Sequence, residues 1–310
     1  MNNQGLKVIK PGALSLVQDL GRWGFQHYGL SPGGAMDEHA ARWANKLLGN
    51  PAKAALLEIT LGNIELLAEC DCQIAITGAK QPLLINQQPV PAWSTCQLRA
   101  GDRLFMGFAT SGQRSYLAVA GGFQIAESFG SVASVQREQI GAFAGQPLRQ
   151  GNGLPCAASC AEKPVRSVPW RYVPDYDQPL TLRVIPGYQA DQFAGRALET
   201  FYNSDYCLSS DSNRMGFRLQ GEVLDSGVSG LLSEGISYGA IQVPPDGQPI
   251  ILMKDRQTLG GYPKLGTVLP LDAFRLSQCR PGTAVRFETM QLPAAQAVMR
   301  AFYTFFSLSC

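Results

Sequence analysis

The chain has 310 residues, of which 45% are hydrophobic and only 16% are charged, and its formal net charge is +2. A chain of this length can bury one large core or two of ordinary size. The low charged fraction, together with 33 glycines and 20 prolines, favours turn-rich β structure. Lysine and arginine are spread along the chain without a basic stripe, so nucleic acid is not expected as a partner.

The sequence contains no signal for a membrane or for export. No run of about 18 apolar residues occurs, so we expect no membrane-spanning segment. The first ten residues are polar and lack an apolar core followed by a small-residue cleavage site. We therefore expect a cytoplasmic protein whose eight cysteines are reduced thiols rather than a disulfide framework.

Most of the chain is predicted to form strands, because short apolar or alternating segments lie between glycines and prolines. Two stretches have helical spacing instead, namely residues 36–48 and residues 293–306. The second carries large apolar residues and is expected to pack on a domain or on a partner. In chain order, the clearest predicted strands are residues 73–77, 114–120, 181–185 and 249–253.

Five prolines between Pro155 and Pro179 mark a predicted domain boundary, because proline discourages both helix and sheet. We expect one domain over residues 1–160 and a second over residues 180–310. The two halves partly repeat each other, since residues 8–12 resemble 184–187 and residues 18–25 resemble 210–217. The repetition predicts two related β-rich domains, and a chance match is the alternative.

Residues 235–239 match the G-x-S-x-G pattern of hydrolase nucleophile elbows. That fold order requires a histidine after Ser237, and the histidines of this chain, His27 and His39, both precede it. We therefore predict a turn between strands. The sequence also lacks a P-loop and a G-x-G-x-x-G motif after a strand, so a nucleotide would have to bind by other means or on another chain.

No metal is predicted. Two histidines are too few for most metal sites, and the cysteines at 70 and 72 and at 156 and 160 lack C-x-x-C spacing and a nearby histidine.

Polar residues and glycines gather in three places. In the first, Gly33 and Gly34 precede a predicted helix and could present backbone N–H groups to an anion. The second is residues 212–218. In the third, residues 254–258 follow a predicted buried strand, where binding residues tend to lie, although a solvated loop with internal ion pairs is equally consistent with the composition.

These places also carry a resemblance to a known family. Residues 212–221, 239–244 with 247–250, and 257–258 with 260–263 resemble motifs of the C-subunit family of 5-oxoprolinases. This family is also called allophanate hydrolase subunit 2 or biotin-dependent carboxyltransferase-like. The amino-terminal half agrees over residues 17–22, 33–37, 57–62 and 114–122, and the resemblance covers most of residues 6–290. One departure is Leu259, where relatives often have a second threonine.

The resemblance implies a mainly β chain with two tandem cyclophilin-like β-barrel domains and a few short helices. It implies an ATP-dependent 5-oxoprolinase that hydrolyses 5-oxo-L-proline, a small cyclic amide, to L-glutamate. The working complex would contain the B subunit of 5-oxoprolinase, with the A subunit for the full reaction. Two alternatives stay open, a biotin-dependent carboxyltransferase chain like that of urea carboxylase and a regulatory protein that binds a kinase inhibitor.

Opening the amide requires cations, donors for the developing oxyanion and a carboxylate that orders water. Either Asp255 or Glu58 could supply that carboxylate. We expect the site residues to converge on one cleft completed by the partner, and Arg214→Ala to reduce catalysis by about 10²-fold without loss of the fold. The predicted catalytic residues are Arg214, Asp255, Gln257 and Lys264, and the predicted substrate-binding residues are Asn213, Gln242, Gln248, Thr258 and Tyr262.

Overall fold

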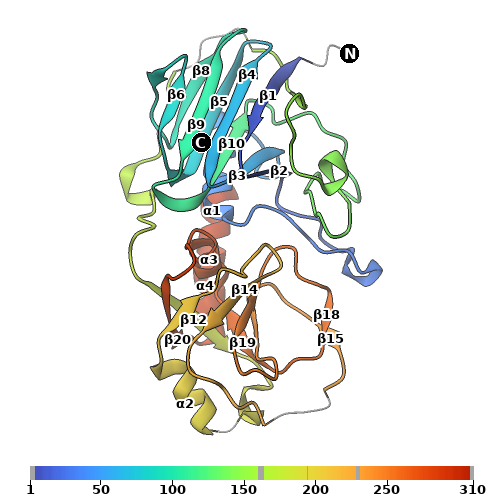
Figure 1. Cartoon of the computed structure of the whole chain (residues 1–310), viewed down its shortest axis with the longest axis vertical. Helices are drawn as coiled ribbons and strands as arrows, with labels where there is room; N and C mark the ends of the chain where they lie inside the picture. Colours follow the sequence, from blue (N-terminus) through green and yellow to red (C-terminus); the bar gives the residue numbers. More distant parts are fainter. Residues whose placement is uncertain (1–3, 160–163, 194, 228–230, 308–310) are drawn as a thin grey trace. The chain divides into compact units, whose positions relative to one another are not determined.

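The computed structural model describes residues 4–159, 164–193, 195–227 and 231–307 (Figure 1). The chain divides into two compact units. The first unit comprises the chain up to Arg22, Gly33–Asp177 and the carboxyl end from Phe306, and the second comprises Trp23–Pro32 and Gln178–Phe305. The change of unit after Asp177 lies inside the proline-rich segment. The domain ranges 1–160 and 180–310 stay a prediction. They place residues 23–32 in the first domain, whereas these residues belong to the second compact unit.

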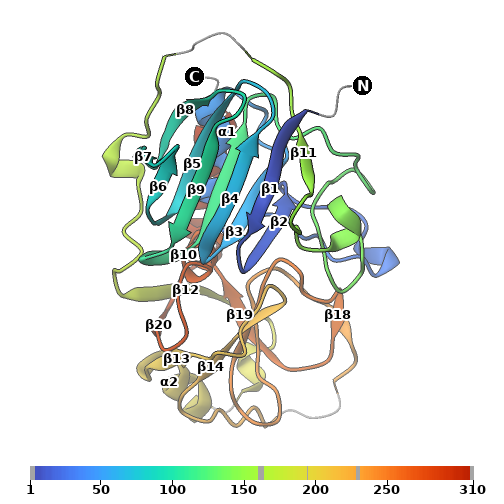
Figure 2. The same ribbon diagram turned by 45° about the horizontal axis from the view of Figure 1, so that its top comes forward.

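The first unit contains two antiparallel sheets, with strand orders β11-β1-β4-β9-β6-β7 and β2-β3-β10-β5-β8. In Figure 2 the strands β6, β9, β4 and β1 of the six-stranded sheet lie side by side. The six strands are β1 (Gly5–Pro11), β4 (Gly62–Ala68), β6 (Leu83–Ile85), β7 (Gln88–Pro89), β9 (Arg103–Phe108) and β11 (Gly153–Pro155). The five strands are β2 (Leu14–Gln18), β3 (Leu56–Thr60), β5 (Cys72–Lys80), β8 (Ser94–Leu98) and β10 (Ser111–Val119).

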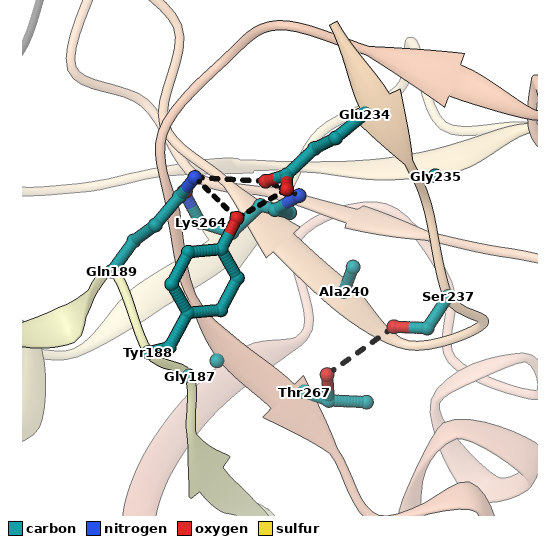
Figure 3. Close-up of a pocket in the computed structure, with 10 residues that line it drawn as sticks. Gly187, Tyr188, Gln189, Glu234, Gly235, Ser237, Ala240, Lys264 and Thr267 are labelled. Carbon is teal, nitrogen blue, oxygen red and sulfur yellow. Dashed lines mark hydrogen bonds and ion pairs between the residues drawn. The ribbon is translucent and has the colours of Figure 1, made fainter. Parts of the chain in front are cut away.

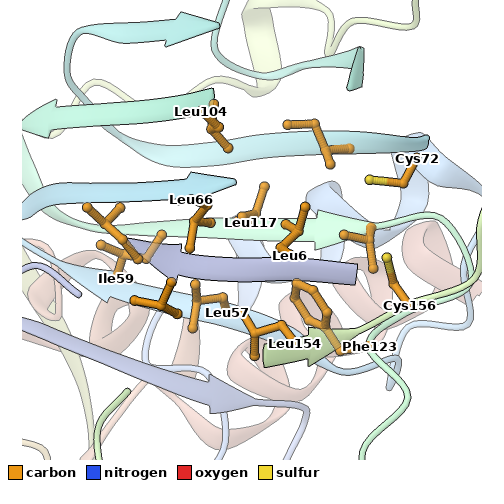
Figure 4. Close-up of a cluster of buried hydrophobic side chains, with 14 of the residues drawn as sticks. Leu6, Leu57, Ile59, Leu66, Cys72, Leu104, Leu117, Phe123, Leu154 and Cys156 are labelled. Atoms are coloured by element: carbon orange, nitrogen blue, oxygen red, sulfur yellow. The ribbon is translucent and has the colours of Figure 1, made fainter. Parts of the chain in front are cut away.

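The core of the first unit joins the two sheets. Leu6 and Leu66 of the six-stranded sheet and Leu57 and Leu117 of the five-stranded sheet belong to one buried cluster (Figure 4). Residues of β4 alternate between buried and half-buried, as expected of a strand with one face in a core. Nearly all residues of β5 are buried, because α1 (Glu38–Leu48) covers its other face.

Helix α1 begins after Asp37, whose side chain accepts a hydrogen bond from the N–H of Ala40 at 3.1 Å. The helix ends at Gly49, which has the left-handed φ of 71° that favours glycine. The residues between Gly33 and this helix are held by side chains of the first unit, as described below.

The second unit is built around a closed barrel with strand order β12-β19-β16-β17-β14-β13-β20. Strand β12 closes it by pairing in parallel with β20 and antiparallel with β19. A separate two-stranded ribbon is formed by β15 (Glu234–Gly235) and β18 (Leu259–Gly260). The barrel strands are β12 (Leu180–Pro186), β13 (Tyr206–Leu208), β14 (Gly216–Gln220), β16 (Ala240–Gln242), β17 (Ile250–Leu252), β19 (Lys264–Val268) and β20 (Ala284–Thr289).

The remaining described elements are helices and short 3-10 turns. They are α2 (Gly195–Asn203), α3 (Pro270–Leu276), α4 (Leu292–Ser307), η1 (Gln26–Tyr28), η2 (Ala142–Gly145), η3 (Trp170–Tyr172) and η4 (Ala190–Gln192).

The predicted mainly β class with few short helices is confirmed. The helices expected at 36–48 and 293–306 are α1 and α4, and the four strands predicted most clearly lie in β5, β10, β12 and β17. Residues 236–239 form the predicted turn between β15 and β16. Helices α2 and α3 had not been predicted. Within the described residues, no helix combines the length and the apolar character that a bilayer crossing requires.

Candidate functional site

A pocket of about 230 Å³ lies on the second unit (Figure 3). Its walls come from the segment after β12, from the β15 ribbon strand and the turn that follows it, and from β19. The polar side chains that line it belong to Tyr188, Gln189, Glu234, Ser237, Lys264 and Thr267.

The Glu234 carboxylate is the centre of the polar contacts in this pocket. The Lys264 ammonium forms an ion pair with it, and the Tyr188 hydroxyl donates a hydrogen bond to it. The side-chain amide of Gln189 donates to Glu234 Oε1 at 2.8 Å and to the Tyr188 oxygen at 3.0 Å. Hydrogen bonding from Lys264 and then from Tyr188 lowers the pKa of Glu234, so this carboxyl group is ionised at neutral pH.

Strand pairing positions these residues. Lys264 opens β19 and pairs with Gln242 of β16, while Glu234 pairs with Gly260 in the ribbon. The backbone N–H of Lys264 donates to Gln189 Oε1 at 2.8 Å, which orients the Gln189 amide group toward Glu234. The side chain of Gln189 therefore connects the barrel strand to the pocket.

Gln242 is buried, and its Nε2 has no hydrogen-bond partner among the described residues. A Cβ atom at Gly260 would lie only 2.8 Å from this nitrogen, so a glycine in the ribbon leaves room for the Gln242 side chain. A buried donor without an acceptor is costly, which makes Gln242 a candidate for contact with a ligand.

Arg214 and Asp255 form a second polar feature of the same unit. The guanidinium donates to both carboxylate oxygens, from Nε and from Nη2, at 2.8 Å each. The two side chains are 7% and 8% exposed. The backbone N–H of Asp255 also donates to the Arg214 carbonyl at 2.9 Å, so main chain and side chains hold the two segments together. Such a bidentate pair has a fixed geometry.

Lys254 and Arg256, on either side of Asp255, are buried too. The Lys254 ammonium lies 4.6 Å from the ring centroid of Tyr238 and 5.5 Å from that of Phe274, a cation–π arrangement. Arg256 donates to two backbone carbonyls, and burial lowers its pKa to about 10, which leaves it charged at neutral pH. The solvated-loop alternative for residues 254–256 is therefore wrong.

The other predicted site residues make local contacts or are partly exposed. Asn213 Oδ1 accepts a hydrogen bond from the N–H of Met215 at 2.8 Å. Gln248 bonds both the N–H and the carbonyl of Gly221, at 2.9 and 3.2 Å. Gln257 and Thr258 are half-buried and Tyr262 is exposed.

The structure thus brings Arg214 to Asp255 and Gln242 to Lys264, whereas Gln248 holds Gly221 and does not line the pocket. The predicted catalytic and binding roles of these residues, and a single cleft for all of them, stay predictions.

Tyr188, Gln189 and Glu234 were missed by sequence reasoning. Tyr188 and Gln189 directly follow the repeated segment 184–187, and polar residues after a strand are the signal that could have identified them. Glu234 lies in a two-residue strand whose pairing with residues 259–260 has no local sequence signature.

The first unit has a buried polar network where an anion site was considered. The N–H of Gly34 donates to Gln18 at 3.1 Å, that of Met36 to Glu58 at 2.7 Å and that of Asp37 to the Tyr116 hydroxyl at 2.7 Å. Protein acceptors thus occupy the backbone donors of Gly34, Met36 and Asp37, and an anion site at Gly33 stays a prediction. Glu58 accepts a further bond from Tyr116 at 2.9 Å.

No group of three or more histidine, cysteine or acidic side chains suited to a metal ion occurs in the described part of the chain. The absence of a bound metal stays a prediction for the protein as a whole.

The sequence profile of the carboxyltransferase domain, subdomain A and B, matches residues 28–289. The chain belongs to this family. It is 37% identical over 299 residues to the 5-oxoprolinase C subunit of Haemophilus influenzae, an alignment that covers 95% of this chain and 94% of that protein. It is 38% identical over 295 residues to the 5-oxoprolinase C subunit of Escherichia coli, covering 94% of this chain and 93% of that one.

The barrel and sheets of this carboxyltransferase-domain protein also match a solved structure. The crystal structure of the K. lactis urea amidolyase superposes with a TM-score of 0.90 at 26% sequence identity. The match covers 99% of this chain and 20% of the amidolyase chain. The family resemblance identified from the sequence motifs is confirmed.

Proposed function

We propose that this chain is the C subunit of an ATP-dependent 5-oxoprolinase, which hydrolyses 5-oxo-L-proline to L-glutamate. The observation that carries the proposal is the likeness to two proteins named as C subunits of 5-oxoprolinase, over 93–94% of their length. By contrast, the chain corresponds to one fifth of the urea amidolyase. The name of these relatives supports a complex, and we propose the A and B subunits of 5-oxoprolinase as its other members.

The residues around the pocket do not fit a nucleoside triphosphate. The sequence has no P-loop, and Lys264 is the one cationic side chain among the described residues that line the pocket, which is too little positive charge for a triphosphate. We therefore propose that ATP is bound outside this pocket, and that this chain contributes to the handling of the cyclic amide.

In this proposal, the catalytic set is Arg214, Asp255, Gln257 and Lys264. Gln257 would donate to the amide oxygen as it becomes negative, and the Lys264 ammonium would supply positive charge to the bound substrate. Asp255 would orient the attacking water, and the bidentate bond to Arg214 would keep the Asp255 carboxylate in place. The proposed substrate-binding residues are Asn213, Gln242, Gln248, Thr258 and Tyr262.

The test is co-expression with the A and B subunits of a 5-oxoprolinase from the same organism, followed by an assay for ATP-dependent release of glutamate from 5-oxo-L-proline. We expect activity from the complex and none from the isolated chain. Robust turnover by the isolated chain would refute the proposal that the reaction needs the other subunits. A complex that releases no glutamate would refute the assigned reaction.

The second candidate is a carboxyltransferase chain of the urea carboxylase kind, which the match to the urea amidolyase favours. Transfer of a carboxyl group to urea, in the presence of a biotin carboxylase partner and without glutamate release, would select this candidate.

A further inference from the structure

The Glu234 carboxylate occupies a position defined by donors from other segments. Lys264 belongs to a barrel strand, and Tyr188 and Gln189 follow another (Figure 3). Gln189 is buried and is fixed by its bond from the Lys264 backbone. Glu234 itself lies on a ribbon with only two residue pairs, and its side chain is 36% exposed. Gln189 and the backbone of Lys264 are therefore held by the barrel, whereas Tyr188 is largely exposed and Glu234 lies on a two-residue strand.

The three donor groups are chemically the complement of a carboxylate. An ammonium, a phenol and a primary amide supply one charge and several N–H or O–H groups, and a carboxylate accepts up to four such bonds. A partly exposed ion pair contributes little to stability, so stability alone does not explain why three donors converge on Glu234. The carboxylate of a ligand would present the same kind of acceptor atoms to these donors.

We propose that Tyr188, Gln189 and Lys264 form the binding site for the carboxylate of a small-molecule ligand, and that Glu234 occupies this site until the ligand displaces it. The pocket, with a volume of about 230 Å³, has room for a small ring. The hydroxyl groups of Ser237 and Thr267 lie 3.4 Å apart in its wall and offer polar contacts to the rest of the ligand.

Only the identity of the ligand rests on the proposed function. If the chain acts in a 5-oxoprolinase, the ligand is 5-oxo-L-proline, which carries one carboxylate beside its cyclic amide. The carboxylate site itself is argued from the geometry of the second unit alone.

Because Glu234 is tethered, it competes at an effective concentration on the order of millimolar or more. Removal of its charge should therefore strengthen binding of a free carboxylate. The variant Glu234→Gln keeps the size of the side chain and removes the charge. We expect it to bind 5-oxo-L-proline about tenfold more tightly than the native chain.

Calorimetric titration of the full-length chain tests this with three ligands. These are 5-oxo-L-proline, 2-pyrrolidinone, which has the same ring amide without a carboxylate, and cyclopentanecarboxylate, which has a carboxylate without the amide. Both carboxylates should bind more tightly to Glu234→Gln, and 2-pyrrolidinone should show no change. Adding Lys264→Met to that variant should weaken carboxylate binding by about tenfold or more, because a charge-assisted bond is lost.

The matched control is Asp205→Asn, which removes the carboxylate of an exposed ion pair with Arg286 elsewhere in the second unit. Its ligand binding should equal that of the native chain. Circular dichroism should show native structure in each variant. Tyr188→Phe is a second probe, because Tyr188 is 70% exposed and the change removes only a hydroxyl; it should weaken carboxylate binding in the Glu234→Gln background.

Unchanged or weaker carboxylate binding by a folded Glu234→Gln chain would overturn the proposal, as would an equal gain for 2-pyrrolidinone. If Glu234→Gln does not fold, unaltered binding by Tyr188→Phe in the native chain would overturn it. A complex that hydrolyses 5-oxo-L-proline while these binding effects are absent would reject this inference and keep the proposed function. The reverse result, tighter carboxylate binding with an inactive complex, would support the site and reject the proposed function.

Discussion

Loss of either partner of the Arg214–Asp255 pair should destabilise the second unit strongly. Both side chains are almost fully buried, and each carboxylate oxygen receives one guanidinium bond of 2.8 Å. Arg214→Ala leaves a buried carboxylate without its cation, which costs about 3–5 kcal/mol in comparable proteins. For a unit of this size, the cost corresponds to a decrease in melting temperature of roughly 10–15 °C.

The double variant Arg214→Met/Asp255→Leu is the matched comparison, because it removes both charges and keeps the volume apolar. Buried pairs replaced in this way often lose little stability, so the double variant should be more stable than Arg214→Ala. Urea unfolding followed by circular dichroism measures both free energies. A cost below about 1 kcal/mol for Arg214→Ala, or a double variant that is less stable still, would refute the reasoning.

Three further predictions concern single positions. Gly34→Ala should lower the free energy of unfolding more than Gly101→Ala. Both glycines have φ above 90°, but only at Gly34 would a Cβ lie 2.9 Å from backbone atoms. The urea concentrations at the unfolding midpoints of the two variants test this. Tyr116→Phe should destabilise the first unit by about 1–3 kcal/mol in the same assay, because the N–H of Asp37 loses its acceptor. Glu234, whose pKa is lowered, should make a small stabilising contribution that is present above its ordinary pKa of 4.5 and disappears as the pH falls further. In thermal melts, the native chain should be slightly more stable than Glu234→Gln at pH 7, and the two should converge in acid.

The strands and the two long helices could be predicted from the sequence because their signals are local. The helix expected at residues 36–48 has apolar periodicity and a glycine stop, and the structure adds the Asp37 cap. Helix α3 was missed because seven residues beginning with Pro270 carry too little periodicity.

The candidate site was less accessible from sequence. Arg214 and Asp255 could be selected as residue types, but their mutual bond depends on the pairing of β14 with β17, which joins segments about 40 residues apart. Because Arg214 is buried, its substitution tests stability as well as catalysis. The expectation that Arg214→Ala would leave the fold intact does not fit a side chain that is 7% exposed in a bidentate pair.

The assignment of residues 23–32 to the second unit has a consequence for the order of events during synthesis. Ser31 donates to the carbonyl of Arg256 at 2.7 Å, so this early segment completes a unit that otherwise begins at residue 178. During synthesis, more than 200 further residues must be added after these ten before Arg256, the partner of Ser31, has been made. A chain cut at the proline-rich segment would likewise separate Ser31 from Arg256, so neither fragment would contain a complete second unit. The two units are therefore consecutive in sequence only in part.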